Sequence, residues 1–523
     1  KIKAPKVRIK VFLVLFITTL IIWCSSCRKD FEYAPSAGNL SFSMDTVYLD
    51  TVFSTIGSST YTLKVYNNNR DDVVIPSISL KNGAASFYRL NVDGTAGKTF
   101  QNIPINAKDS LFIFIETTVD ISENTENTLL YTDAIQFDIE ADRQEVQLVT
   151  LVKDAIFLYP ETDSDGEPEM ITLDFDADGN EVKVEGFGLD DTELNFTNEK
   201  PYVIYGYAVV PDGKELIINP GARIHFHKDS GLLVKEGASL SANGMLSENQ
   251  ELLENEIIFE GDRLEPSFSD IPGQWSGIWI ANGSTNNRIA YTTIKNGVVG
   301  LFIEGDDELL TPTLTINNSQ IYNNASHNIW AETAFIEAEN VVLGGSGSSS
   351  LYCSLGGNYS FVHSTIANYW SNGFRIKPAL EIDNFKSSIG NNNIEADLVK
   401  ADFKNCIISG NSAIELSLVS NGENDFSFNF SSCFIKFDDF GNQFQNNPLY
   451  DFESNTNYES ILFNGNPDFF GTNANDFRLG LDSELINMGN TDFSLQVPLD
   501  ILETDRTSNP DLGAYQAIAK EQE

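Results

Sequence analysis

A ten-residue pattern occurs six times between Asn287 and Phe437, and it limits what this chain can fold into. Each copy reads apolar, x, apolar, x, Asn-like, small, x, apolar, x, turn, as in LTINNSQIYN and ADFKNCIISG. The starts are separated by 27, 22, 23, 42 and 27 residues and lie at Asn287, Leu314, Ile336, Tyr359, Ala401 and Phe428. A period in this range is typical of a solenoid, in which each repeat stacks on the next.

Each copy predicts two very short strands around a tight corner. The corner residues are Asn318, Asn340, His363, Asn405 and Ser432. Asn suits such a corner because it tolerates the left-handed conformation. The apolar positions that we expect to point inward are Ile316, Ile321, Phe361, Ile366, Phe403, Ile408, Phe430 and Ile435.

A coil this narrow buries its apolar face only by stacking on its neighbours, so the repeat predicts a right-handed parallel β-helix. An α-solenoid is the competing interpretation. The spacing of two and the bias to β-branched and aromatic residues count against it. The step of 42 residues predicts a loop of about twenty residues, roughly 369–399, that leaves one coil.

The first residues are typical of a targeting segment. A basic start is followed by the short apolar run Val11 to Trp23 and then by Cys-Ser-Ser-Cys. The small residues before Cys27 resemble the lipobox of bacterial lipoproteins, which implies that Cys27 is lipidated. A plain secretory signal cut near Ser26 is the alternative. Residues 28–32, RKDFE, resemble the acidic export signal of Bacteroidota lipoproteins, which implies a lipid anchor on the outer face of the outer membrane.

The net charge of the chain limits which classes of partner it can bind. Its formal net charge is −42, and removal of residues 1–26 would lower Lys+Arg from 33 to 28 against 75 Asp+Glu, giving −47. Such a field repels nucleic acid and anionic lipid, so no nucleic-acid partner is expected.

Cys406 and Cys433 occupy the same position in consecutive copies and are expected about 4.8 Å apart. They could form a disulfide or serve as small core residues.

We expect five regions along the chain. A signal peptide (1–26) and a tether (27–37) precede an Ig-like β-sandwich (38–155), whose short alternating strands include TYTLKVYNNN and SLFIFIETTVD. An acidic linker or hairpin (156–200) leads to the β-helix with its C-terminal cap (201–516). The lipobox, the sandwich, KPYVIYGYAVV and the closing DLGAY together resemble Bacteroidota surface lipoproteins of the pectate-lyase-like β-helix type. This resemblance implies the architecture and no particular reaction.

One segment fits a calcium-loop pattern. Asp174, Asp176, Asp178, Gly179 and Glu185 match D-x-D-x-D-G-x5-E, which would supply hard oxygen ligands. The flanks ITLDFD and EVKVEGF alternate like strands, however, so an acidic β-hairpin without a metal is the alternative.

Catalysis has little support in the sequence. His225 and His227 alternate on one strand, which is compatible with a metal pair or with a structural role. Candidate acids for a polysaccharide lyase or hydrolase, with Arg375 and Lys377 as basic partners, form no recognisable constellation: Glu304, Asp306, Asp307, Glu332, Glu337 and Glu339.

Aromatic residues favour binding instead, because Trp and Tyr stack on sugars and anchor interfaces. Trp370, Tyr369 and Phe374, at the start of the long loop, are the candidates expected to be exposed, whereas Trp279 in GIWI is expected in the core. We therefore predict a non-catalytic binding or scaffold subunit. It would belong to an outer-membrane complex, with a β-barrel or with transport or assembly machinery as partner, or it would bind a glycan. A β-helix polysaccharide lyase or glycoside hydrolase is the alternative.

Overall fold

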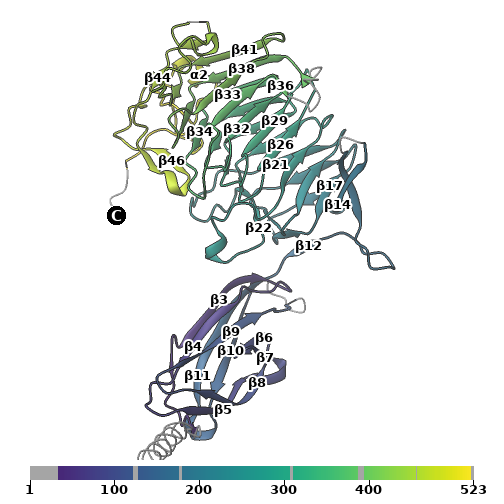
Figure 1. Ribbon diagram of the computed structural model, residues 1–523. Helices are drawn as coiled ribbons and strands as arrows, with labels where there is room; N and C mark the ends of the chain where they lie inside the picture. The colour runs from purple at the N-terminus through teal and green to yellow at the C-terminus, as the bar shows by residue number, and fades with distance from the viewer. Residues whose placement is uncertain are drawn as a thin grey trace, which may run out of the picture. The chain divides into compact units, whose positions relative to one another are not determined.

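The computed structural model describes residues 33–121, 128–175, 179–306, 310–386, 394–454 and 456–519. The chain forms two compact units, Lys1–Lys153 and Asp154–Glu523 (Figure 1). Among the described residues, no helix is both long and apolar enough to cross a membrane. Each unit is all-β in character and has a core of its own.

The N-terminal unit is a β-sandwich of two sheets. One sheet contains, in spatial order, β1 (Ala34–Pro35), β5 (Val73–Leu80), β10 (Thr128–Phe137), β11 (Gln144–Lys153) and β3 (Thr46–Phe53), with β8 (Thr99–Ile105) also paired to β5. The other contains β2 (Ser41–Phe42), β4 (Tyr61–Tyr66), β9 (Ser110–Thr117), β6 (Tyr88–Val92) and β7 (Thr95–Gly97). Alternate residues of β4 and β9, such as Leu63 and Ile113, are fully buried between the sheets, as the alternation of period two requires.

The second unit is a parallel β-helix whose coils each give one strand to each of three sheets. The first sheet contains β12 (Ile156–Leu158), β16 (Tyr202–Ile204), β19 (Arg223–Phe226), β22 (Ile257–Gly261), β25 (Thr292–Lys295), β28 (Gln320–Tyr322), β31 (Val342–Leu343), β34 (Thr365–Asn368), β39 (Ile407–Gly410), β42 (Phe434–Ile435) and β44 (Leu462–Phe463). The second sheet contains β13 (Met170–Phe175), β14 (Glu181–Gly188), β17 (Tyr207–Val210), β20 (Gly231–Val234), β23 (Gly277–Ile280), β26 (Leu301–Glu304), β29 (Ile329–Glu332), β32 (Leu351–Ser354), β35 (Leu380–Asp383) and β40 (Leu416–Val419). The third sheet contains β15 (Asn195–Phe196), β18 (Glu215–Ile218), β21 (Ser239–Asn243), β24 (Asn287–Ala290), β27 (Leu314–Asn317), β30 (Phe335–Glu339), β33 (Gly357–Val362), β38 (Leu398–Lys404), β41 (Phe426–Ser431) and β43 (Tyr458–Glu459).

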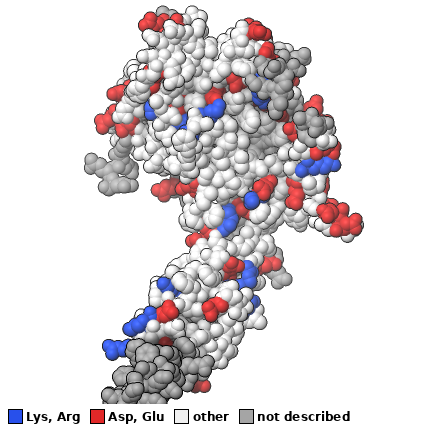
Figure 2. Space-filling view, viewed as in Figure 1, with Lys and Arg blue, Asp and Glu red and all other residues white. Residues whose placement is uncertain are grey.

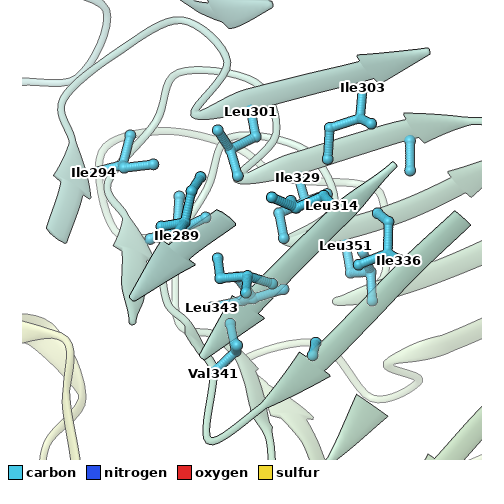
Figure 3. Close-up of a cluster of buried hydrophobic side chains, with 14 of the residues drawn as sticks. Ile289, Ile294, Leu301, Ile303, Leu314, Ile329, Ile336, Val341, Leu343 and Leu351 are labelled. Carbon is cyan, nitrogen blue, oxygen red and sulfur yellow. The ribbon is translucent and has the colours of Figure 1, made fainter. Parts of the chain in front are cut away.

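The predicted fold class, an Ig-like β-sandwich followed by a parallel β-helix, is confirmed. The corners lie between the third and first sheets at positive φ: Asn318 (47°), Asn340 (54°), His363 (49°), Asn405 (52°) and Ser432 (53°). All eight residues expected to point inward are fully buried, and several stack rung upon rung. The rings of Phe361 and Phe403 are 5.3 Å apart, and those of Phe403 and Phe430 are 4.9 Å apart. Figure 3 shows the same inward stacking around Ile289, Leu314 and Ile336.

Two boundaries differ from expectation. The β-helix begins before residue 201, because β12, β14 and β15 of the expected linker already pair in parallel with the next coil. The last coil ends in an aromatic cluster that includes Phe437, Tyr450 and Phe452. The closing segment beyond it therefore does not serve as an end cap.

Residues 468–518 run back along the outer face of the first sheet instead (Figure 1). This flank segment includes β45 (Phe469–Gly471), β46 (Asp476–Leu479) and α2 (Thr491–Ser494). Phe477 packs on the outward Val342 and Ala367. The fully buried Arg506 donates to the carbonyl oxygen of Gly513 at 3.0 Å and to Asn340 Oδ1 at 3.0 Å, so the segment is tied to the corner row.

Cys406 and Cys433 do lie on adjacent rungs, where the backbone N–H of Cys406 donates to Cys433 Sγ at 3.4 Å. Both thiols are free and fully buried. They are small core residues, one of the two alternatives left open by the sequence.

Candidate functional site

The outer face of the second sheet carries a column of aromatic side chains. Trp279, Phe302, Trp330 and Tyr352 are register partners on the consecutive strands β23, β26, β29 and β32. Each follows one inward residue of its strand, such as Leu301 before Phe302, so the alternation of the strand turns the ring outward. The ring centroids are separated by 5.2, 4.9 and 6.1 Å along the column. We call these four residues the aromatic column.

His327, in the turn before β29, extends the aromatic surface. Its ring lies 5.5 Å from the rings of Trp330 and Tyr352, and its Nδ1 is 2.9 Å from Ser326 Oγ. Burial lowers the pKa of His327 to about 4, and the charge of Lys377 adds to this. The imidazole is therefore neutral near pH 7.

A second column of polar residues runs beside the first, two residues further along each strand. Glu304, Glu332, Ser354 and Asp383 follow one another from β26 to β35. Hydrogen bonds connect the columns, since Trp279 Nε1 donates to Glu304 at 2.7 Å and the Tyr352 hydroxyl donates to Asp383 at 2.8 Å. The outer face of the sheet therefore presents a column of aromatic rings beside a column of side chains that accept hydrogen bonds.

The acids of the polar column differ in their surroundings. Burial raises the pKa of the Glu304 carboxyl, and the neighbouring charges of Glu332 and Asp174 act in the same direction. Glu332 forms an ion pair with Lys386, whose ammonium group lies 5.7 Å from the centre of the Trp330 ring. The indole N–H of Trp330 is buried and has no hydrogen-bond partner among the described residues.

The aromatic column borders a hollow of ≈ 330 Å³ at its N-terminal end. Leu173 of β13 and Tyr207 of β17 line the hollow together with Trp279, Phe302 and Trp330. On the face of the molecule drawn in Figure 2, acidic side chains are spread over the surface, and the described residues form no continuous basic patch.

The aromatic residues expected from the sequence lie elsewhere. Trp370, expected to be exposed, is 8% exposed, and Tyr369 packs against Phe469 and Phe477 of the flank segment. Tyr369 and Trp370 both line one small pocket, whereas Phe374 is 90% exposed and is not among the residues that line it. The predicted loop 369–399 is not one excursion. Residues 369–379 pack on the coils, where Arg375 forms a buried ion pair with Glu415 at 2.7 Å, and β35 (Leu380–Asp383) is a regular strand of the second sheet.

The expectation for Trp279 was also wrong. Trp275 fills the core at 1% exposure and stacks on Phe226, whereas Trp279 faces outward in the aromatic column. Phe302 and Tyr352 were not predicted as site residues from the sequence. The signal that would have found them is the recurrence of apolar-aromatic-apolar-polar in LFIE, IWAE and LYCS.

The calcium-loop segment is a hairpin over its described residues. β13 and β14 pair antiparallel, with Asp174 opposite Val182 and Glu185 opposite Met170. Asp174 and Glu185 therefore do not converge as the two ends of a calcium loop would. Asp176 and Asp178 lie outside the described residues, and calcium binding stays a prediction.

The remaining catalytic candidates are dispersed. Glu337 and Glu339 lie on β30 in the third sheet, Lys377 pairs with Glu381 at 2.6 Å, and Asp307 lies outside the described residues. His225 faces Glu260, whereas His227 is 2.7 Å from Asp262. Among the described residues, no three His, Cys, Asp or Glu side chains form a metal-binding group.

No protein-family model matches the chain, and no curated protein matches it. Among solved structures, it is similar to the catalytic unit of a GH87 α-1,3-glucanase from Streptomyces thermodiastaticus, with 10% identity, 71% of this chain and 78% of that chain covered, and a TM-score of 0.22. The Agl-KA catalytic domain gives 13% identity, coverage of 71% and 75%, and a TM-score of 0.20. A family 123 glycoside hydrolase from Clostridium perfringens gives 9% identity, coverage of 23% of this chain and only 30% of that chain, and a TM-score of 0.16. Likenesses this weak carry no argument about activity.

Proposed function

We propose that this protein is a lipid-anchored protein of the outer cell surface that binds a glycan, without cleaving it, along the aromatic column of its β-helix. The observation that carries the proposal is the column itself, four aromatic rings on consecutive rungs beside a row of hydrogen-bond acceptors. Aromatic faces cover the C–H faces of sugar rings, while carboxylates and hydroxyls bind sugar hydroxyl groups.

The column suits an extended chain better than a single sugar. Its four rings follow the rungs, which are spaced by about 4.8 Å, so the glycan would lie along the axis of the β-helix. The hollow beside Leu173 and Tyr207 would receive one end of that chain. The acidic column and the net charge of −42 favour a neutral glycan over a polyanion.

The decisive experiment replaces one ring and measures glycan binding. Trp330→Ala removes one of the two inner rings of the column, and we expect at least a tenfold loss of affinity for the best neutral polysaccharide found by affinity electrophoresis or calorimetry. Phe374→Ala is the matched control, because Phe374 is a 90%-exposed aromatic residue away from the column. Equal affinities of wild type and Trp330→Ala, or a loss in Phe374→Ala alone, would remove the column from the binding site.

A glycoside hydrolase is the second candidate, and one observation favours it. Glu304 and Glu332 are register partners on adjacent rungs, and only Glu332 is paired with a cation. Two carboxylates in different surroundings at short range are what an acid and a nucleophile require. Release of reducing ends from a bound polysaccharide, abolished in Glu304→Gln, would establish this function in place of simple binding.

The anchor and the partners rest on the sequence alone, because Cys27 lies outside the described residues. We expect Cys27→Ser to abolish incorporation of a fatty-acid label and to release the protein from the outer-membrane fraction. We also propose an outer-membrane β-barrel or its transport or assembly machinery as a partner. Mild-detergent purification of the lipidated protein tests this, and recovery of the protein without a barrel would contradict it.

A further inference from the structure

A groove of ≈ 400 Å³ lies on the outer face of the first sheet, away from the aromatic column of the second sheet. We propose that this groove is a second carbohydrate site, which binds one or two units of a neutral sugar independently of the aromatic column. Its floor is formed by β25 and β28, and its walls are the 246–256 loop and the flank segment.

The groove exists because two covers of the first sheet stop short of each other. From β31 onward, the flank segment covers the sheet. On the other side, the 246–256 loop is tied down by hydrogen bonds from Gly244 N to Ala290 O at 2.9 Å and from Met245 N to Asn255 O at 3.0 Å. Two rungs between these covers are left open.

Residue type changes where the cover ends. Under the flank segment several outward residues of the sheet are apolar, namely Val342, Ala367, Ile407 and Phe434, although Thr365 and Ser409 in the same columns are polar. In the open rungs the corresponding positions hold Gln320 and Tyr322, which line the groove. A ligand site is a concave surface that encloses most of its ligand, and the walls on both sides of these open rungs provide such a surface. A sheet face that only contacts water has no need of such walls.

The lining combines hydrogen-bonding groups with apolar walls. Gln320 Oε1 accepts a hydrogen bond from the Tyr515 hydroxyl at 3.3 Å, so the Gln320 NH2 group is the part of this amide that remains to donate to a ligand. Thr292 and Asn318 add further polar atoms to the floor. Leu246, Leu253, Ile501 and Leu502 provide the apolar walls against which the C–H face of a sugar ring can lie.

The charges of the groove exclude an anionic ligand. Arg478 is the one cationic side chain among the lining residues, and Asp476 holds it in an ion pair at 2.5 Å. Glu256, which is 6% exposed, also lines the groove, and burial raises the pKa of its carboxyl. A uronate or a phosphate would meet carboxyl groups without a free cation to balance them, while a neutral sugar would not.

The walls are fixed before a ligand arrives. Asn475 Oδ1 accepts a hydrogen bond from Gly345 N at 2.7 Å, and Asn340 Nδ2 donates to Leu499 O at 3.0 Å. Tyr291 donates from its hydroxyl to Glu503 at 3.0 Å across the groove rim. A site that is already ordered loses little conformational entropy on binding.

The test uses the full chain and calorimetric titration with cellobiose, laminaribiose, maltose, lactose and, as the anionic probe, digalacturonate. In the Trp330→Ala background, which disables the aromatic column, we expect saturable binding of at least one neutral disaccharide and none of digalacturonate. Gln320→Leu and Tyr322→Phe, each added to that background, are expected to weaken this binding at least tenfold. Gln496→Leu, the same kind of change at an exposed position of the flank segment, is the control and is expected to leave it within twofold.

Circular dichroism and the melting temperature show whether each variant is folded, and Tyr322→Phe keeps the ring if Gln320→Leu does not fold. Absence of neutral disaccharide binding in the Trp330→Ala background overturns the groove proposal, but it does not affect the proposal that the aromatic column binds a glycan. Loss of polysaccharide binding in Trp330→Ala with disaccharide binding retained supports both sites. Preference for digalacturonate would overturn the assigned ligand class.

Discussion

Single residues at positive φ hold the corners between the third and first sheets. The sequence predicted five of them correctly because the left-handed conformation admits few residue types, and Asn stands at three of the five. His363 is the informative exception. Its Nδ1 lies 3.3 Å from Gly513 O, and its Nε2 lies 3.0 Å from both Asn405 Nδ2 and Ser494 Oγ. Only a neutral ring satisfies this set, with Nδ1 donating and Nε2 accepting.

Replacement of His363 by the Asn that other corners use should change how stability depends on pH. Burial lowers the pKa of His363 well below 6.5, and the charge of Arg506 adds to this. The unfolded chain therefore binds a proton that the folded chain does not, so stability is present above pH 6.5 and is lost as pH falls below it. We expect His363→Asn to flatten the pH dependence of the urea midpoint between about pH 6.5 and 4.5. An unchanged slope would mean that this ring titrates freely in the fold.

Outward and inward positions were harder to assign than corners. Trp275 and Trp279 are four residues apart in one short segment, yet one fills the core and the other faces out. Alternation fixes which residues share a face, but not which face is inside, because that depends on the coils above and below. The aromatic column could therefore be recognised only when β26, β29 and β32 were in register.

At the scale of elements, the flank segment is the feature that sequence reasoning placed wrongly. Its closing DLGAY was expected to cap the last rung, because an exposed strand edge is a hazard. Aromatic residues between Phe437 and Phe463 take that role instead. The overlooked signal was the apolar character of outward positions such as Ile407 and Phe434, which need a cover of their own.

The flank segment should depend strongly on one buried cation. Arg506 is fully buried and donates to Gly513 O, Asn340 Oδ1 and Ala514 O, so Arg506→Ala would leave buried acceptors without partners. We expect a loss of about 3 kcal/mol in stability and faster proteolytic cleavage within residues 468–518.

Arg478→Ala serves as the comparison for this variant. Arg478 is ion-paired with Asp476 but keeps 39% of its side-chain surface exposed, so its removal should cost about 0.5 kcal/mol. Similar protease resistance in wild type and Arg506→Ala would show that the segment is held by its apolar contacts alone.

At the scale of the whole molecule, the two units have separate cores and should unfold separately. The chain has five Trp residues, and all those within the described residues belong to the β-helix, namely Trp275, Trp279, Trp330 and Trp370. Tryptophan fluorescence therefore reports on the β-helix, whereas far-UV circular dichroism reports on both units. We expect urea titrations by the two probes not to coincide, and circular dichroism to show an additional transition. Coincident single transitions would show that the units unfold as one.

The architecture followed from the repeat because a period of about 22 to 27 residues with alternating apolar positions has few stable solutions. The candidate sites could not be predicted from the repeat, because a column of side chains on a solenoid consists of residues that are one whole coil apart in the sequence. Phe302 and Trp330 are register partners, but no short motif contains both.

The flank segment also sets an order of events during synthesis. Tyr515 contacts Gln320 across 195 residues of chain, so the cover of the first sheet is made well after the strands that it covers. At about 5 to 20 residues per second, the ribosome would need roughly ten to forty seconds to complete it. During that interval Val342 and Ala367 would face water, and the nascent protein would expose an apolar strip until the flank segment packed on it.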